Sequence, residues 1–136
     1  MTEQKMVVAS GKRKTSIARA TLKAGKGIIR INKQVLDSYG NDLGRMKIRE
    51  PLMLANNFDG KVDISVNVHG GGVQSQAEAS RLAIAKALLM FSGNNQDLKK
   101  KFLDYDRHLL VADVRYKEMC KPNDSKARAK RQKSYR

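Results

Sequence analysis

The chain of 136 residues is 40% hydrophobic and 30% charged, and it carries a net charge of +15 at pH 7. This length supports one compact domain with a core and is too short for two ordinary domains. No run reaches the roughly 20 apolar residues of a membrane span. Residues 1–14 hold no sizeable apolar run, so they do not have the pattern of a signal peptide. We therefore expect a soluble, cytoplasmic protein without a membrane partner.

The positive charge is concentrated at the two ends of the sequence. Residues 1–33 include nine basic residues and one acidic, residues 34–98 six and seven, and residues 99–136 thirteen and five. A net charge this far from zero repels a compact chain unless a polyanion compensates it, and nucleic acid is the first candidate. We therefore expect both basic ends to face one polyanion.

The first third of the chain is typical of short strands. Residues 6–9 and 17–22 are rich in β-branched and small apolar side chains, and they flank a basic turn at residues 11–14. The glycines of residues 24–27 predict a second turn, followed by a strand at residues 28–31. These three strands are expected to form an antiparallel meander.

The next segment predicts helices only weakly. Residues 35–39 are compatible with a short helix, and residues 50–55 with another that begins with Pro51 at its first position. Residues 61–69 then alternate apolar and polar side chains, which predicts a strand with one buried and one exposed face.

A glycine triplet at residues 70–72 precedes the strongest helix signal. Ser75 and Glu78 have the spacing of a capping box, and the small and apolar residues that follow predict a helix to about Ser92. Gly93 is expected to end this helix in a left-handed conformation.

The last elements complete a mixed fold. Asn95 is placed to cap a second helix that runs through Leu103, and residues 109–116 are typical of a final strand. We predict an α+β fold of two layers, in which a four-stranded sheet carries helices on one face and an extended basic tail follows, so that one of the five strand segments lies outside the sheet.

Basic residues on the first predicted hairpin are the first candidate binding site. Lys12, Arg13, Lys14 and Arg19 lie within residues 4–36, an interval without a single acidic residue. Side chains on a rigid strand and turn can meet a phosphate backbone without the entropic cost of ordering a flexible arm. The alternative is a solvated surface turn.

The C-terminal tail is the second candidate site. Residues 126–136 hold six basic residues, no acidic residue and one large ring, Tyr135, which is too little apolar surface to order the segment by itself. Eleven extended residues span at most about 36–40 Å, arginines can clamp phosphates, and Tyr135 can stack on a base or ribose. A solubilising tail or a localisation signal are the alternatives.

Catalytic and metal chemistry have little support. The glycine triplet invites comparison with a phosphate-binding loop, but no GKS or GKT follows, so close packing of strand and helix is the favoured interpretation. His69 and His108 are isolated, and Asp104, Asp106 and Asp113 are expected to pair with neighbouring basic residues. We expect no metal, no cofactor and no small-molecule substrate. The single cysteine, Cys120, excludes an internal disulfide and predicts a partly buried, unreactive side chain.

Several segments between Ser10 and Arg136 have the residues and spacing of one known family. They are residues 11–15 with 18–19, residues 25–27 with 31–32, residues 70–76 with Ala79, Ala83 and 85–88, Asp113 and Arg115 with Glu118, and residues 127–128 with Arg136. With these motifs the chain resembles the family of the ninth protein of the small ribosomal subunit, whose eukaryotic counterpart is numbered sixteen. The ending, residues 132–136, is similar to archaeal and eukaryotic members rather than to bacterial ones.

This resemblance implies an RNA-binding structural protein of translation in the head of the small subunit, not an enzyme. It implies a fold similar to the second domain of small-subunit protein five, a globular domain at residues 1–118 and an RNA-binding tail at 119–136. It also implies small-subunit rRNA, the P-site tRNA anticodon stem-loop and neighbouring head proteins as partners. The residues implied for tRNA are Lys133, Tyr135 and Arg136, and those for rRNA are Lys12, Arg13, Lys14, Arg19, Lys121, Lys126, Arg128, Lys130 and Arg131.

Two other function classes share features with this sequence. Small-molecule kinases with the same fold class carry a glycine-serine loop before a helix, but they need a second half that 136 residues cannot hold, and no serine cluster follows Gly72. A free-standing DNA- or RNA-binding module stays open, since charge alone does not distinguish one polyanion from another.

Overall fold

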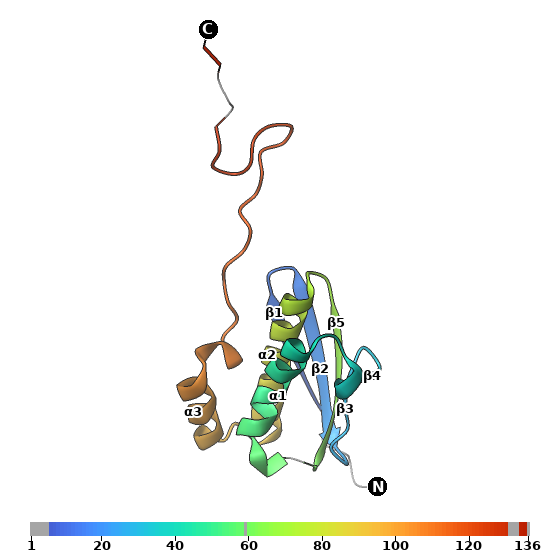
Figure 1. Cartoon of the computed structure of the whole chain (residues 1–136). Coiled ribbons are helices and arrows are strands. Elements are labelled where there is room, and N and C mark those ends of the chain that lie inside the picture. The colour runs from blue at the N-terminus through green and yellow to red at the C-terminus, as the bar shows by residue number, and fades with distance from the viewer. Residues whose placement is uncertain (1–5, 59, 131–133, 136) are drawn as a thin grey trace.

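The computed structural model describes residues 6–58, 60–130 and 134–135. Within these residues the protein consists of a sheet, three α-helices packed on one side of it, and a C-terminal segment that extends away from this body (Figure 1). None of the helices in the described part of the chain is long and apolar enough to cross a membrane.

The sheet has five strands in the described residues, not the four predicted. The additional strand arises because Asn32 and Lys33 both adopt positive φ angles, 48° and 70°, which turn two residues back onto the preceding strand. The strands are β1 Met6–Arg13, β2 Ser16–Ala24, β3 Ile29–Ile31, β4 Gln34–Val35 and β5 Val62–His69, and their order in the sheet is β1-β2-β5-β3-β4.

The order of the strands corrects the predicted meander. β1 and β2 form the expected antiparallel hairpin, but β1 extends to Arg13, so the turn consists of Lys14 and Thr15. β5 then inserts between β2 and β3, and β3 pairs with β5 in parallel, with Ile31 opposite Val66. This arrangement buries the apolar residues of β3 beside those of β5, which the local sequence pattern did not reveal.

The helices follow the predicted order with different boundaries. They are η1 Leu36–Ser38, α1 Asp42–Leu54, η2 Asn56–Phe58, α2 Val73–Phe91, α3 Gln96–Tyr105 and η3 Arg107–Leu109. Pro51 lies inside α1 rather than at its start, and α2 begins after Gly72 without a side-chain cap, so the capping box was wrong. Asn95 caps α3 by accepting a hydrogen bond from the Asp97 amide, and Gly93 has the predicted left-handed conformation, with φ of 73°.

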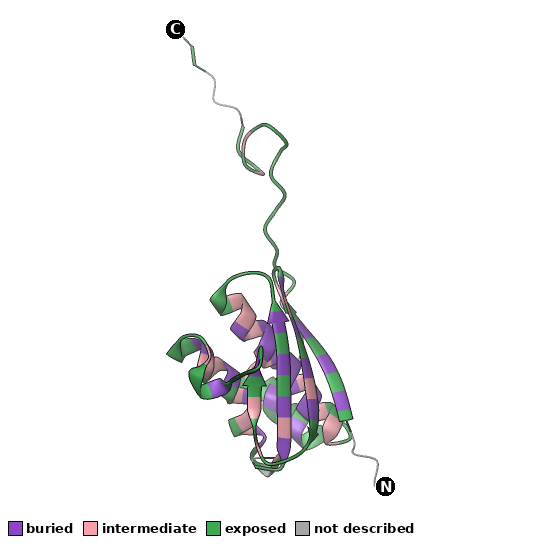
Figure 2. Ribbon diagram, turned by 90° about the vertical axis from the view of Figure 1, so that its right-hand side faces the viewer, coloured by how far each residue is buried: buried purple, intermediate pink, exposed green. Residues whose placement is uncertain are grey.

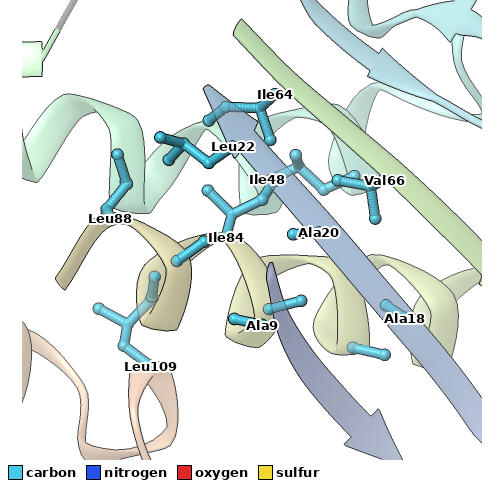
Figure 3. Close-up of a cluster of buried hydrophobic side chains, with 14 of the residues drawn as sticks. Ala9, Ala18, Ala20, Leu22, Ile48, Ile64, Val66, Ile84, Leu88 and Leu109 are labelled. Carbon is cyan, nitrogen blue, oxygen red and sulfur yellow. The ribbon is translucent and has the colours of Figure 1, made fainter. Parts of the chain in front are cut away.

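Small residues let α2 lie close against the sheet. Ala77, Ala79, Ala83, Ala85 and Ala87 are fully buried, and the core continues through the larger residues of β2, β5 and α1 (Figure 3). At Gly11, β1 lies so close to α2 that an added Cβ would be 2.2 Å from the carbonyl oxygen of Ala79. Only glycine fits at this position of β1.

The sheet is covered on one face and exposed on the other. Buried and exposed residues alternate along β1, β2 and β5, as Figure 2 shows by the alternating bands on these strands. Helix α2 contacts β1, β2 and β5 on the buried face, and α1 packs on α2. The exposed face carries the side chains that no helix covers.

The strand predicted at residues 109–116 was wrong. Leu109 is buried at the end of η3, and residues 112–130 contain neither helix nor strand. The apolar residues of this segment are present, but Val114 is 82% exposed, because the chain leaves the body here and pairs with none of the strands.

Candidate nucleic-acid interface

Three of the four predicted cations of the β1–β2 hairpin are exposed. Lys12 lies near the end of β1 and Arg19 on β2, and both point to the uncovered face of the sheet. Lys14 lies in the turn with φ of 52°, so its side chain stands at the tip of the hairpin. The backbone at these positions is held by the hydrogen bonds of the hairpin, so little backbone conformational entropy is lost when a phosphate binds.

Arg13, the fourth predicted cation, is placed differently. Its side chain is only 16% exposed, and its guanidinium forms ion pairs with Glu78 at 2.7 Å and with Asp113 at 3.2 Å. Lys47 binds the other carboxylate oxygen of Glu78 at 2.9 Å. Arg13 therefore joins β1, α2 and the start of the C-terminal segment, and its contact with rRNA stays a prediction.

The C-terminal segment is attached to the hairpin where it leaves the body. Asp113 accepts hydrogen bonds from the backbone and side chain of Arg115, which hold the pKa of the Asp113 carboxyl well below its usual range. The ammonium of Lys12 lies 5.3 Å from the ring centroid of Tyr116. The structure thus brings the two basic ends of the sequence together at one end of the sheet (Figure 2).

Beyond Tyr116 the tail contacts itself. Arg128 forms an ion pair with Glu118 at 2.8 Å, and the ammonium of Lys121 donates to the carbonyl of Ala129 at 3.0 Å. These contacts close a loop between residues 118 and 129; Lys126 within it and Lys130 directly after it are exposed. Cys120 is exposed as well, so the predicted partial burial was wrong.

The final predicted residues are described only in part. Tyr135 is 86% exposed, which leaves its ring open to stacking. Arg131, Lys133 and Arg136 lie outside the described residues, and their roles stay predictions.

Sequence reasoning missed two further cations near Arg19. Lys23 and Arg30 are exposed, and the strand register places both on the same uncovered face of the sheet. The period-two alternation in β2 could have placed Lys23 beside Arg19. The position of Arg30 depends on the parallel pairing of β3 with β5, which no local pattern indicated.

The glycine triplet packs against the hairpin. Gly70 and Gly71 have φ of 76° and 64°, and an added Cβ at Gly71 would lie 2.1 Å from the hydroxyl of Ser16. That hydroxyl donates a hydrogen bond to the carbonyl of Gly70 at 2.8 Å. These contacts agree with the packing interpretation of the triplet rather than with a nucleotide-binding loop.

The described residues do not assemble a catalytic or metal centre. A groove of about 720 Å³ lies between α1, η2, β3 and β5, but its lining is mostly apolar and its charged residues, Arg49 and Asp37, pair with each other. Within the described part of the chain, no three His, Cys, Asp or Glu side chains lie close enough to hold a metal ion. Asp106 pairs with Arg81 at 2.7 Å, as predicted for an acid among basic residues.

Comparison with known families matches residues 11–136 to the family described as Ribosomal protein S9/S16. The chain belongs to this family. It is 50% identical over 134 residues to a protein of Methanococcus maripaludis, with 97% of this chain and 99% of that protein covered. It is also 51% identical over 132 residues to a protein of Desulfurococcus amylolyticus, with 97% and 94% covered. Both relatives are named small ribosomal subunit protein uS9.

Family membership confirms the main functional prediction. The chain is a structural constituent of the small ribosomal subunit, located on cytoplasmic ribosomes, and not an enzyme. The resemblance to archaeal members is confirmed too, since a third relative at 50% identity over 132 residues is from Methanothrix thermoacetophila.

Proposed function

We propose that the body of this protein binds small-subunit rRNA in the head of the subunit and that the tail reaches the anticodon stem-loop of the P-site tRNA. One observation carries the proposal: the exposed cations of the hairpin tip and the root of the basic tail lie side by side, joined by the Arg13–Asp113 and Lys12–Tyr116 contacts. A single folded RNA can therefore meet both basic ends at once.

The proposed roles divide the basic residues by their surroundings. Lys12, Lys14 and Arg19 bind rRNA phosphates directly, whereas Arg13 positions the tail root and approaches RNA only at the edge of its ion pairs. The tail residues proposed for rRNA are Lys121, Lys126, Arg128, Lys130 and Arg131, and those proposed for tRNA are Lys133, Tyr135 and Arg136.

We also propose the boundaries and neighbours of these parts. We place the boundary between a globular domain at residues 1–118 and a tail at 119–136, because contacts with the body run through Tyr116 and the ion pair of Glu118 with Arg128 marks the start of the tail's own contacts. The mixed sheet with helices on one face supports a fold like the second domain of small-subunit protein five. Neighbouring head proteins complete the set of partners.

The experiment follows tagged protein in sucrose gradients of cell extracts. Charge reversal at Lys12, Lys14 and Arg19, each to Glu, is expected to reduce incorporation into small subunits roughly tenfold or more, because three phosphate contacts become repulsive. The matched control reverses Lys99, Lys100 and Lys101 on α3, which are equally exposed and should leave incorporation unchanged. Equal incorporation of both triple variants would count against the rRNA role.

A second arm tests the tail. Replacing residues 132–136 by glycine and serine keeps the length but removes the charges and the ring. We expect normal assembly of such subunits and weaker retention of P-site tRNA in filter binding. If tRNA affinity is unchanged while assembly is normal, residues 132–136 do not contact tRNA.

A further inference from the structure

The uncovered face of the sheet is wider than the hairpin. It is built from alternate residues of β1, β2, β5 and β3, whose side chains share one face because residues opposite each other in paired strands point the same way. The register puts Ser10, Arg19 and Asn67 in one row and Thr21, Ser65 and Arg30 in the next. Figure 2 marks the exposed residues of the strands as bands that alternate with buried ones.

The three cations on this face beyond Lys12 are evenly spread. Two residues along a strand advance by about 6.6 Å and neighbouring strands lie about 4.8 Å apart. Arg19 and Lys23 are therefore about 13 Å apart, and Arg30, two strands away, lies about 12 Å from each of them. This spacing covers several successive phosphates of a nucleic-acid strand.

Arg19 and Arg30 have no carboxylate partner among the described residues. The acid on this face is Asp63, and its carboxylate accepts hydrogen bonds from the backbone amides of Ile28 at 3.0 Å and Lys26 at 2.8 Å. These bonds direct Asp63 toward the turn after β2, where it offsets part of the charge of Lys23. The two arginines remain available to an external anion.

Several basic residues on the helix side of the sheet, in contrast, have carboxylate partners. There, Arg13, Arg45, Lys47, Arg49 and Arg81 all form ion pairs with carboxylates of the body or the tail root. Arginine carries five donors in a planar fork that matches phosphate as well as carboxylate. Two unpaired arginines on a flat face with hydroxyl and amide groups between them therefore indicate a phosphate ligand.

The remaining side chains of the face narrow the kind of RNA. Ser10, Ser65 and Asn67 are exposed and can hydrogen-bond riboses and phosphates, whereas no Phe, Tyr or Trp lies on these strand positions and His69, at the end of β5, supplies their one ring. Recognition of single-stranded RNA relies on stacking against aromatic rings, but an RNA helix is bound through its backbone and 2′-hydroxyls.

We propose that this face, with Arg19, Lys23 and Arg30 as phosphate ligands and Ser65 and Asn67 between them, binds the sugar-phosphate backbone of an rRNA helix. Lys23, Arg30, Ser65 and Asn67 are thereby added to the hairpin and tail as RNA contacts. The inference rests on the proposed function, since it extends the rRNA-binding surface of the body.

The test measures binding of the full chain to a transcript of small-subunit rRNA as a function of salt. The binding constant falls with salt, and each lost phosphate contact makes the slope of log K against log salt shallower by about one. We therefore expect Arg19→Met with Arg30→Met to make this slope shallower by about two. The matched control is Arg45→Met with Arg49→Met, two cations of the helix side, for which we expect the wild-type slope. Circular dichroism establishes that both double variants are folded.

Directed hydroxyl-radical cleavage then locates the RNA. The natural cysteine is removed by Cys120→Ser, and an iron chelate is attached to Asn67→Cys or, in a second protein, to Ser65→Cys, within particles assembled in vitro. We expect both probes to cut the two strands of one rRNA helix.

The outcomes separate this inference from the proposed function. If wild-type protein shows no salt-dependent binding to the transcript, the proposed function fails. If wild type binds but Arg19→Met with Arg30→Met keeps the wild-type slope, or if particles assemble without cleavage from either probe, this face does not bind RNA. Cleavage confined to unpaired nucleotides would contradict the assignment to a helix. If a crosslinker attached at the same two cysteines instead joined this chain to another protein, the face would be covered by a protein rather than by RNA.

Discussion

The two sides of the sheet use the same kinds of cation in opposite ways. On the helix side, Arg13, Lys47 and Arg81 are paired within the protein: Glu78 binds Arg13 and Lys47, and Arg81 binds Glu50 and Asp106. On the uncovered face, Arg19 and Arg30 form no ion pair with any residue that the structure describes. Pairing therefore tells more about the role of an arginine here than the net charge of +15 does.

Arg13 and Arg19 show this difference within one hairpin. Both belong to the acid-free stretch of the sequence, and both were predicted to bind rRNA. Arg13 is fixed by Glu78 and Asp113, two acids that come from distant parts of the chain. Partner residues 65 and 100 positions away in sequence thus decide which of two similar arginines stays available.

The largest effect is expected on stability, from substitutions at two neighbouring residues of β1. Gly11 faces the helices, and Ser10 lies on the uncovered face. Gly11→Ala would place a Cβ 2.2 Å from the Ala79 carbonyl oxygen and 2.7 Å from the Ala83 amide nitrogen, so helix and sheet must separate. We expect a loss of about 3 kcal/mol in the free energy of unfolding in urea. Ser10→Ala, on the uncovered face, should change it by less than about 0.5 kcal/mol. Similar losses for both variants would mean that the two faces are not packed as described.

A smaller effect separates paired from unpaired arginines. The side chain of Arg81 is 12% exposed, and Arg81→Met leaves Glu50 and Asp106 without their common partner. We expect a loss of about 2 kcal/mol in urea unfolding, below the range for a fully buried pair because both carboxylates keep some contact with water. Arg19→Met should lie within about 0.5 kcal/mol of wild type but weaken binding to rRNA.

The reverse result would break the comparison. If Arg81→Met retained wild-type stability and lost rRNA binding, while Arg19→Met unfolded more easily, then ion pairing would not distinguish structural from RNA-binding arginines in this protein.

How much of this could be predicted depended on the range of the interactions. The hairpin, the strand at Val62–His69, the cap at Asn95 and the stop at Gly93 follow from patterns within a few residues, and they were predicted. The parallel pairing of β3 with β5 depends on contacts between residues about 35 apart. The capping box failed because the N-cap of α2 is Gly72 and Ser75 lies inside the helix, while Glu78 pairs with the distant residues Lys47 and Arg13.

The site was predicted in the same uneven way. A lack of acids identified Lys12, Lys14 and Arg19, whose exposure depends only on the alternation of a strand and a tight turn. Arg30 was missed because its place on the uncovered face depends on the strand order, and the pairing of Arg13 was missed because Asp113 lies 100 residues away.

The smallest effect is expected at the tail root, where the two basic ends of the sequence meet. Asp113→Asn weakens the contact with Arg13, whereas Glu118→Gln removes the same charge from a pair that lies within the tail. Spin labels on the natural Cys120 and on Met90→Cys of α2, both exposed, report the distance between tail and body. We expect a broader distance distribution for Asp113→Asn than for wild type or Glu118→Gln, with no measurable change in global stability.

The same distance between the spin labels, measured as a function of pH, tests whether the ion pair of Asp113 with Arg13 depends on an ionised Asp113. Because the Arg115 side chain and amide lower the pKa of Asp113 in the folded protein, its contact should be fully present above the ordinary carboxyl pKa of 3.8 and be lost as the pH falls further below it. The wild-type distribution should therefore stay narrow from pH 7 to pH 5, and Asp113→Asn should be broad throughout that range. A narrow distribution for Asp113→Asn would mean that the remaining contacts, Lys12 with Tyr116 and Arg13 with the Arg115 carbonyl, hold the tail root, and the ion pair with Arg13 would then have no part in directing the tail toward its RNA.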